Sequence, residues 1–384
     1  MRKFKIVVRG GYGLTNFGDD ALLQSIHKDY LDDYSNSELG YSCTYADYLK
    51  NDIGDYEILP LNSNYSDLTD ILIYGGGTQF YSFNNEQTFL EKTFSKMTLL
   101  FKPKKLIQSI AFKLKHSFYS EKQKDDEKVL SMALGIGLGP FLDVSNPQKE
   151  LKTKQLFEKM SFVAVRDIYS LKKCKEWNLQ NYAMYADLCF KMKHSKFFPN
   201  KTNKNIEKVG VIVRDWNNTK KGKSYRLNLI QTVDAIRKAG KDVTFIIFAK
   251  DKDPSWLKIL KRNNEKILLW DPNIFSIRSF FDELSVFDIF ITARYHGAVF
   301  SAMLGKPFIT IEVEQKLTMI SELFSDSSYN WSYPFLKLDL IEALNKIELN
   351  YEDFSSKTVS IALKQKQLAE KMKFDLDLAI KKTY

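Results

Sequence analysis

Three arginines come directly after apolar runs of the kind that form buried strands. Arg166 lies in VAVRD, Arg214 in VIVRDW and Arg294 in ITARYHG. Ligands of open α/β sheets bind beyond the carboxyl ends of the strands, so all three guanidinium groups are expected to face one cleft. Arginine binds carboxylate and phosphate in bidentate fashion, and the set therefore predicts an anionic ligand with both groups. For the first two arginines, ion pairs with the adjacent Asp167 and Asp215 are the alternative.

One histidine accompanies these arginines. His296 follows Arg294 by two residues, on the same side of the chain if the strand continues to that point. Imidazole titrates near neutral pH, so His296 is predicted to act as a general acid or base. The other histidines, His27, His116 and His194, have no such setting. Because no HxxxH or HxH spacing occurs, we expect no metal site and no metal-dependent mechanism.

Glycine-rich loops follow three further apolar runs. The first, GGYGLTNFGDD, places glycines at the start of an expected helix, where backbone N–H groups suit an anion or a sugar hydroxyl. It does not match the GxGxxG dinucleotide fingerprint. Glycine lets a ligand approach the backbone closely, whereas tight turns and helix capping are the structural alternative. The residues predicted to line the cleft are Asn16, Asp19, Asp20, Gly76, Gly77 and Gly137.

Apolar runs alternate with helical segments along most of the chain, a pattern typical of parallel α/β sheets. The predicted strands lie in the runs 4–9, 71–80, 130–140, 161–174, 209–216, 242–249, 266–270, 287–297 and 306–313. With 384 residues, the chain exceeds the size at which one core keeps growing. The polar, basic stretch from His194 to Glu207 separates two such series. We therefore predict two Rossmann-like, doubly wound domains, 1–198 and 207–384, facing a cleft as in the GT-B arrangement of glycosyltransferases. A C-terminal helix is predicted over about 356–381, and it could pack back on the N-terminal domain.

Composition favours a cytoplasmic protein. The three cysteines stand far apart, and no stretch is long and apolar enough for a signal sequence or a membrane span. Within the N-terminal domain, residues 99–128 form a basic amphipathic insertion, either an ordinary peripheral helix or one that lies on an anionic membrane. The net charge of +10 is also compatible with binding to nucleic acid. That interpretation leaves the residues at the strand ends unexplained, so we expect no nucleic acid.

Seven segments together resemble the polysaccharide pyruvyl transferases, which add ketal-linked pyruvate to cell-surface sugars. In order they are GYGLTNFGDDALL, IYGGGTQF, ALGIGLGPF, VAVRDIYS, YADLCF, VIVRDW and RYHGAVFSAMLGKPFITIEVEQK. The resemblance implies transfer from phosphoenolpyruvate without a cofactor. It assigns Arg166 and Arg294 to the donor's phosphate and carboxylate and His296 to proton transfer. Lys316 is a further anion contact, and Arg214 joins this donor side from its position after a strand.

The resemblance also implies an acceptor, a sugar of a cell-surface polysaccharide or of its lipid-linked precursor. The N-terminal glycine loops would face this acceptor, and the protein would contact the inner face of the plasma membrane peripherally. The chain departs from the family pattern at Asp187-Leu188-Cys189 and at GGGTQF, which would alter acceptor choice. The alternative is a GT-B-type sugar-nucleotide glycosyltransferase, in which Glu312 or Glu314 would bind the nucleotide ribose.

Overall fold

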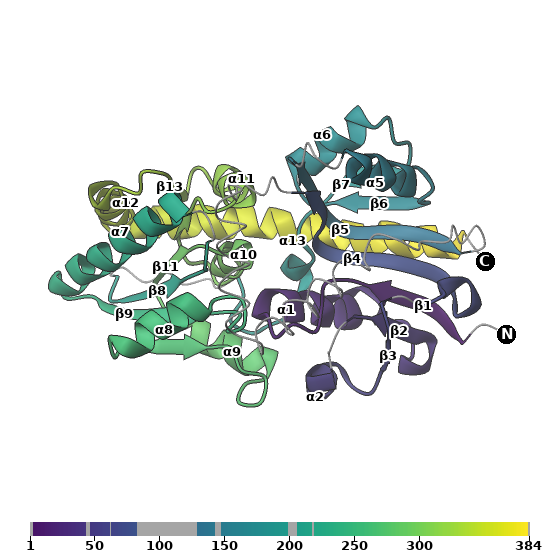
Figure 1. The fold of residues 1–384 in the computed structure, drawn as a ribbon, viewed down its shortest axis with the longest axis horizontal. Coiled ribbons are helices and arrows are strands. Elements are labelled where there is room, and N and C mark those ends of the chain that lie inside the picture. The colour runs from purple at the N-terminus through teal and green to yellow at the C-terminus, as the bar shows by residue number, and fades with distance from the viewer. Residues whose placement is uncertain are drawn as a thin grey trace, which may run out of the picture.

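The computed structural model describes residues 3–43, 47–61, 63–82, 129–142, 147–198, 206–216 and 219–382. These residues form two parallel β-sheets, each surrounded by helices (Figure 1). This confirms the predicted α/β class with two Rossmann-like, doubly wound units. The predicted basic insertion 99–128 lies outside the described residues. Within the described part of the chain, no helix has the length and apolar character that crossing a membrane requires.

The N-terminal sheet has seven parallel strands in the order β3-β2-β1-β4-β5-β6-β7. Its strands are β1 (Phe4–Arg9), β2 (Leu39–Ser42), β3 (Glu57–Leu59), β4 (Thr69–Ser82), β5 (Leu130–Phe141), β6 (Phe162–Val165) and β7 (Tyr182–Met184). The helical segments around it are α1 (Phe17–Ser25), η1 (Ile26–Tyr30), η2 (Asn36–Glu38), η3 (Asp47–Leu49), α2 (Lys50–Ile53), η4 (Tyr65–Asp67), α5 (Gln148–Glu158), α6 (Ile168–Glu176) and η6 (Leu188–Lys191). Ile6, Val7 and Val8 of β1 are fully buried, as expected for a central strand covered on both faces.

The C-terminal sheet has six parallel strands in the order β10-β9-β8-β11-β12-β13. Counted from β8, this is the doubly wound order 3-2-1-4-5-6. The strands are β8 (Lys208–Ile212), β9 (Asp242–Ile247), β10 (Ile267–Leu269), β11 (Ile289–Thr292), β12 (Phe308–Ile311) and β13 (Ser328–Trp331). The helices are α7 (Thr219–Lys238), α8 (Pro254–Arg262), α9 (Ile277–Leu284), α10 (Tyr295–Met303), α11 (Gln315–Leu323) and α12 (Lys337–Leu349).

The last helix, α13 (Tyr351–Lys381), contacts both domains (Figure 1, yellow). Near its start, the Tyr351 hydroxyl donates to the carbonyl of Asp288, just before β11, at 2.6 Å. Near its end, Asp375 accepts a 2.7 Å hydrogen bond from the hydroxyl of Tyr185, which follows β7. Its 31 residues span about 46 Å at 1.5 Å per residue, enough to reach from one sheet to the other.

Phe17, which follows the loop after β1, packs into the C-terminal domain. Phe17, the first residue of α1, is fully buried, and its backbone N–H donates to the carbonyl of Phe248 at 3.0 Å. Its ring contacts five aromatic rings of the C-terminal domain with centroids 4.5–5.2 Å away, namely Phe248, Trp270, Phe280, Phe281 and Phe300. At these distances, aromatic pairs stabilise the interface beyond the contribution of the apolar area that they bury. The first turn of α1 is therefore fixed on the opposite domain.

Asp20, in the same turn of α1, makes a second contact between the domains. Its carboxylate accepts hydrogen bonds from Trp270 Nε1 at 2.8 Å and from the Tyr48 hydroxyl at 2.7 Å. Burial raises the pKa of Asp20 to about 7, although both hydrogen bonds act in the opposite direction. The domain interface thus contains a carboxyl group that titrates near neutral pH.

Replacing Phe17 with alanine should uncouple the domains. Loss of a buried phenylalanine typically costs about 3–5 kcal/mol, and here the cavity would open between domains rather than inside one. We expect lower stability in urea and a larger radius of gyration in small-angle scattering. Phe245→Ala, inside the C-terminal core, is the matched control and should cost stability without changing the radius. Equal radii for the two variants would contradict this assignment.

The proton on Asp20 should make stability depend on pH. A carboxyl whose folded pKa lies above its unfolded value binds more protons when folded between about pH 4 and pH 7, so stability falls as pH rises through that window. Asp20→Asn removes this dependence. Between about pH 5.5 and pH 8, the wild type should therefore lose about 2 kcal/mol relative to the variant, measured by urea unfolding. A difference that does not change with pH would refute the shift.

Candidate functional site

A cavity of about 250 Å³ lies between the carboxyl ends of the two sheets. It is lined from both domains. The N-terminal domain contributes the carboxyl-terminal parts of β4 and β5 and the segments after β1 and β6, and the C-terminal domain contributes the segments after β8, β9, β11 and β12. Five cationic side chains face it, namely Arg166, Arg214, Lys252, Arg294 and Lys316. The three predicted arginines, Lys316 and His296 therefore lie around one cavity.

Arg166 is the buried cation on the N-terminal side. Its Nη1 donates to Asp187 Oδ2 at 2.7 Å, and its Nη2 donates to Thr78 Oγ1 at 3.0 Å. The guanidinium lies 4.3 Å from the centre of the Tyr295 ring, a cation–π contact across the domain boundary. Asp167, which the sequence offered as the alternative ion-pair partner, lies 3.9 Å from Arg166 Nε, farther than Asp187 from Nη1. Nε has no hydrogen-bond partner among the described residues.

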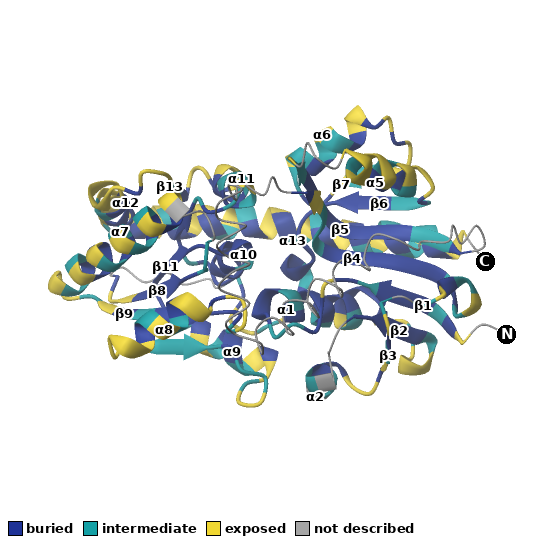
Figure 2. Ribbon diagram, viewed as in Figure 1, coloured by how far each residue is buried: buried dark blue, intermediate teal, exposed yellow. Residues whose placement is uncertain are grey.

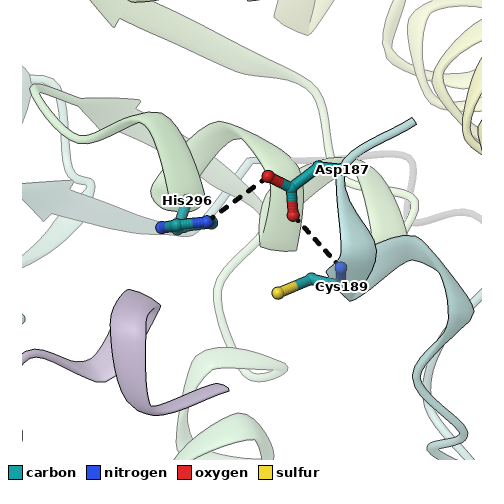
Figure 3. A group of neighbouring side chains, drawn as sticks. All are labelled: Asp187, Cys189 and His296. Carbon is teal, nitrogen blue, oxygen red and sulfur yellow. Dashed lines mark hydrogen bonds and ion pairs between the residues drawn. The ribbon is translucent and has the colours of Figure 1, made fainter. Parts of the chain in front are cut away.

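His296 approaches the same carboxylate from the other domain (Figure 3). Its Nε2 lies 3.5 Å from Asp187 Oδ2, an ion-pair distance that is too long for a well-formed hydrogen bond. The other carboxylate oxygen accepts from the backbone N–H of Cys189 at 3.1 Å. Burial acts to raise the pKa of Asp187, but His296 and Arg166 outweigh it and hold that pKa well below its usual range. Asp187 is thus a buried anion shared by an arginine and a histidine.

The backbone places His296 differently from the predicted extension of the strand. β11 ends at Thr292, whose hydroxyl accepts from the backbone N–H of Arg294 at 3.1 Å and donates to the carbonyl of Arg294 at 2.9 Å. The chain turns there, and α10 begins at Tyr295. The strand therefore does not continue to His296, and strand alternation does not place the two side chains. Both nevertheless line the cavity, Arg294 from just before α10 and His296 from its first turn.

Gly18 sets the distance between α1 and the histidine. A Cβ at this position would lie 2.3 Å from His296 Nδ1, which no side chain tolerates. The imidazole also stacks on Phe300 of its own helix, with ring centroids 5.8 Å apart. His296 is therefore positioned both by α1 of the other domain and by its neighbour in α10.

Two carboxylates pair with the cations of the C-terminal domain. Arg294, 8% exposed, donates through Nη2 to the fully buried Asp253. Glu314 lies between Arg214 and Lys316, and its Oε2 is 2.8 Å from Lys316 Nζ. Burial acts to raise the pKa of Glu314, but Lys316 and Arg214 overcome it and lower the pKa to about 2. Pairing of Arg214 with Asp215 is not observed, because the Asp215 carboxylate accepts from the first backbone N–H groups of α8.

Most of the predicted cleft residues line the cavity. Asn16, Asp19, Gly77 and Gly137 all do so. The amide of Asn16 donates to Asp19 Oδ2, and its buried Oδ1 has no partner among the described residues. Asp19 also lies 3.5 Å from Lys252 Nζ of the other domain. Burial acts to raise the pKa of Asp19, but Lys252 and His296 lower it overall.

Two predicted cleft residues are placed elsewhere. Asp20 does not line the cavity, because its carboxylate is turned into the domain interface toward Trp270. Gly76, within β4, packs against Leu188, whose side chain a Cβ would meet at 2.7 Å. For these two residues the prediction of a cleft position was wrong. Glycine at position 76 allows Leu188 to approach the strand closely.

Asp187, Cys189 and His296 also form the group of described residues that could hold a metal ion, with ligand atoms within 4.8 Å of one another (Figure 3). The sequence search missed this group because its members come from distant segments. The donor set is unfavourable for a cation. Arg166 already pairs with the carboxylate, and burial together with Asp187 raises the pKa of the Cys189 thiol, whereas metal ligation requires the thiolate.

Several cavity residues were not predicted. Asp187 lies in the quoted segment YADLCF but received no role, and Asp253 comes a few residues after the predicted strand 242–249. Asp253 follows a predicted strand, as the arginines do, so a search of strand ends would have included it. Asp187 follows β7, a strand that was not predicted. Thr78, Lys252 and Tyr295 carry no comparable signal in the sequence.

The fold is similar to that of solved sugar-nucleotide enzymes. Among the similar structures are S. aureus MnaA with UDP (TM-score 0.58, 11% identity, covering 96% of this chain and 94% of that chain) and a putative UDP-N-acetylglucosamine 2-epimerase from Listeria monocytogenes (0.57, 12%, 95% and 94%). Anabaena HepE with UDP and glucose has a TM-score of 0.50 at 13% identity, with 99% of each chain covered. At such identities the likeness shows the fold alone, a GT-B-like pair of domains.

The family assignment rests on the sequence. The chain has no significant match among curated proteins. The family model of the polysaccharide pyruvyl transferases matches residues 16–315, a span that begins at the glycine loop before α1 and ends beside the Glu314 carboxylate. It includes every cationic residue of the cavity except Lys316. The chain belongs to the polysaccharide pyruvyl transferase family.

Proposed function

We propose that the chain transfers pyruvate from phosphoenolpyruvate to two hydroxyls of a sugar, forming a cyclic ketal and releasing phosphate. The observation that carries this proposal is the meeting of five cationic side chains and one histidine around a single cavity. A small donor with both a phosphate and a carboxylate matches that charge. The scheme requires no cofactor, because the donor's own phosphate is the leaving group.

The donor would lie between the arginines of the two domains. Arg166 and Arg294 each keep a buried Nε without a partner among the described residues, so each retains N–H donors for an anion. Arg214 and Lys316 share the Glu314 carboxylate, and in this proposal both cations would also bind the donor. The donor must compete with that carboxylate. Contacts of this kind are stronger in a cavity that excludes water than in bulk solvent.

His296 would supply the proton that starts the reaction. The imidazolium protonates the methylene carbon of the enol, which leaves a cation at C2. One sugar hydroxyl adds to C2 and returns its proton to the imidazole; the C2–O bond to phosphate then breaks, and the second hydroxyl adds as its proton leaves with phosphate. Asp187 is the positioning residue in this scheme, since its buried carboxylate lies 3.5 Å from Nε2 and attracts the imidazolium electrostatically.

The acceptor would enter from the N-terminal side. Asn16 Oδ1, without a described partner, and the backbone at Gly77 and Gly137 offer groups for sugar hydroxyls. We propose a sugar of a cell-surface polysaccharide or its lipid-linked precursor, which would place the reaction at the cytoplasmic face of the membrane.

A sugar-nucleotide glycosyltransferase is the alternative, favoured by one observation. Glu314 lines the cavity, where the ribose-binding acid of such an enzyme was expected, while Glu312 accepts from Asn330 outside it. Because Glu314 is held by two cations, a ribose would have to break that pairing. Thermal protection separates the two activities, since only the true donor should raise the melting temperature.

Replacing His296 should abolish turnover but preserve donor binding. Loss of a general acid costs about a hundredfold to ten-thousandfold in rate. We expect this decrease in acceptor-dependent phosphate release from phosphoenolpyruvate for His296→Asn, with nitrophenyl or lipid-linked sugars as acceptors and mass spectrometry of the product. Phosphoenolpyruvate should still raise the melting temperature of the variant. His194→Asn, outside the cavity, is the control; a decrease in both variants, or protection by nucleotide sugar alone, would overturn the proposal.

Asp187→Asn should lower turnover while leaving donor binding nearly intact. The variant keeps the shape of the side chain but removes the negative charge that lies 3.5 Å from His296 Nε2. Since that charge positions the imidazole, kcat should fall, but by less than the loss of about a hundredfold to ten-thousandfold expected without the general acid itself. Asp253→Asn removes an equally buried charge beside Arg294 and should instead raise KM for phosphoenolpyruvate. A rise in KM without a fall in kcat for Asp187→Asn would mean that Asp187 does not position His296.

A further inference from the structure

An exposed apolar loop lies on the surface of the C-terminal domain. Residues 332–339 lead from β13 into the first turn of α12. In this loop Tyr333, Leu336 and Leu338 are 42%, 51% and 68% exposed, and Pro334 is exposed between them. An exposed leucine is ordinary on its own, but several apolar side chains in one short loop form a patch that calls for a partner.

The first turns of α7 extend this patch. Ser224 Oγ donates to the carbonyl of Pro334 at 2.8 Å, so helix and loop are in direct contact. Lys221 Nζ lies 5.6 Å from the centre of the Tyr333 ring. Leu227, on the same part of α7, is 59% exposed. Figure 2 shows exposed residues along both α7 and α12, which pack against each other.

The same surface is basic. Its exposed lysines are Lys220, Lys221 and Lys223 in α7 and Lys337 at the start of α12. Among the exposed residues of 332–339, Asp339 is the one acidic side chain. Long lysine side chains beside apolar ones can place their charge in a layer of anionic headgroups while the apolar groups go deeper.

The patch belongs to the same edge of the sheet as the cavity. The chain after β8 reaches Arg214 and then α7, and the chain after β12 reaches Glu314. β13 pairs with β12 in parallel, so the loop after β13 leaves the sheet at that edge too. A surface bound through this patch would therefore lie at the same edge of the C-terminal sheet as the site.

We propose that residues 332–338 and the first turns of α7 form a docking surface for an anionic phospholipid membrane. The leucines and the tyrosine ring enter the boundary between headgroups and acyl chains, and the lysines contact the lipid phosphates. A second copy of the chain is a poorer occupant, because two identical basic surfaces repel each other. The proposal is independent of the donor and concerns residues other than 99–128.

Vesicle sedimentation tests the proposal on the full chain. The wild type should bind vesicles rich in phosphatidylglycerol and not vesicles of phosphatidylcholine alone. A Lys220→Ser/Lys221→Ser/Lys223→Ser variant should bind about a hundredfold more weakly, since each lysine near an anionic surface contributes about 1 kcal/mol. Leu336→Ser/Leu338→Ser should weaken binding at least about tenfold. Both variants should keep wild-type phosphate release with a soluble acceptor.

Matched substitutions elsewhere serve as controls. Leu349→Ser, 83% exposed at the other end of α12, and Lys258→Ser/Lys261→Ser in α8 should bind vesicles like the wild type. The three native cysteines are buried, so Leu336→Cys can carry an environment-sensitive dye whose emission should shift to the blue on anionic vesicles. The proposal is overturned if the wild type does not bind, if the patch variants bind unchanged, or if they alter only a dimer seen by sedimentation.

Discussion

The insertion of Phe17 into the aromatic cluster of the opposite domain is the contact on which the site depends. It fixes the first turn of α1 on the C-terminal domain through a ring contact and a backbone hydrogen bond to Phe248. Gly18 is then pressed against His296, and Asn16 and Asp19 face the cavity. The geometry of the proposed chemistry is therefore a consequence of domain packing. Neither domain holds a complete site alone.

Charge balance is the second constraint, and it follows from burial. A lone buried charge is unfavourable, so the cations that line the cavity need anionic partners. Each of the five cavity cations has a carboxylate neighbour, namely Asp187, Glu314, Asp19 and Asp253, with Glu314 serving two. Asp187 and Asp253 are fully enclosed, whereas Glu314 lines the cavity. The proposed donor could therefore displace Glu314 from its cations more readily than Asp187 or Asp253.

Strands with a clear apolar run were predicted, and four strands without one were missed. The runs beginning at residues 4, 71, 130 and 242 correspond to β1, β4, β5 and β9, because fully buried strands have continuous apolar sequences. The short strands β6, β10, β11 and β12 were predicted as well, from the runs beginning at residues 161, 266, 287 and 306. Four other short strands were not predicted, namely β2 (LGYS), β3 (EIL), β7 (YAM) and β13 (SYNW). β2 and β13 contain glycine, serine or asparagine, and β3 and β7 have only three residues, so none of the four forms an apolar run of strand length.

The site residues that the sequence identified are those with a signal inside a single segment. A guanidinium after a strand is visible in one segment, so Arg166, Arg214 and Arg294 could be located without knowing the neighbours of that segment. The partner of a buried charge comes from wherever the fold brings it, and Asp187 reaches His296 only because the two sheets face each other. The fold is shared with enzymes that bind nucleotides. What argues for a different donor here is therefore the arrangement of charge in the cavity, a property of side chains that backbone similarity does not report.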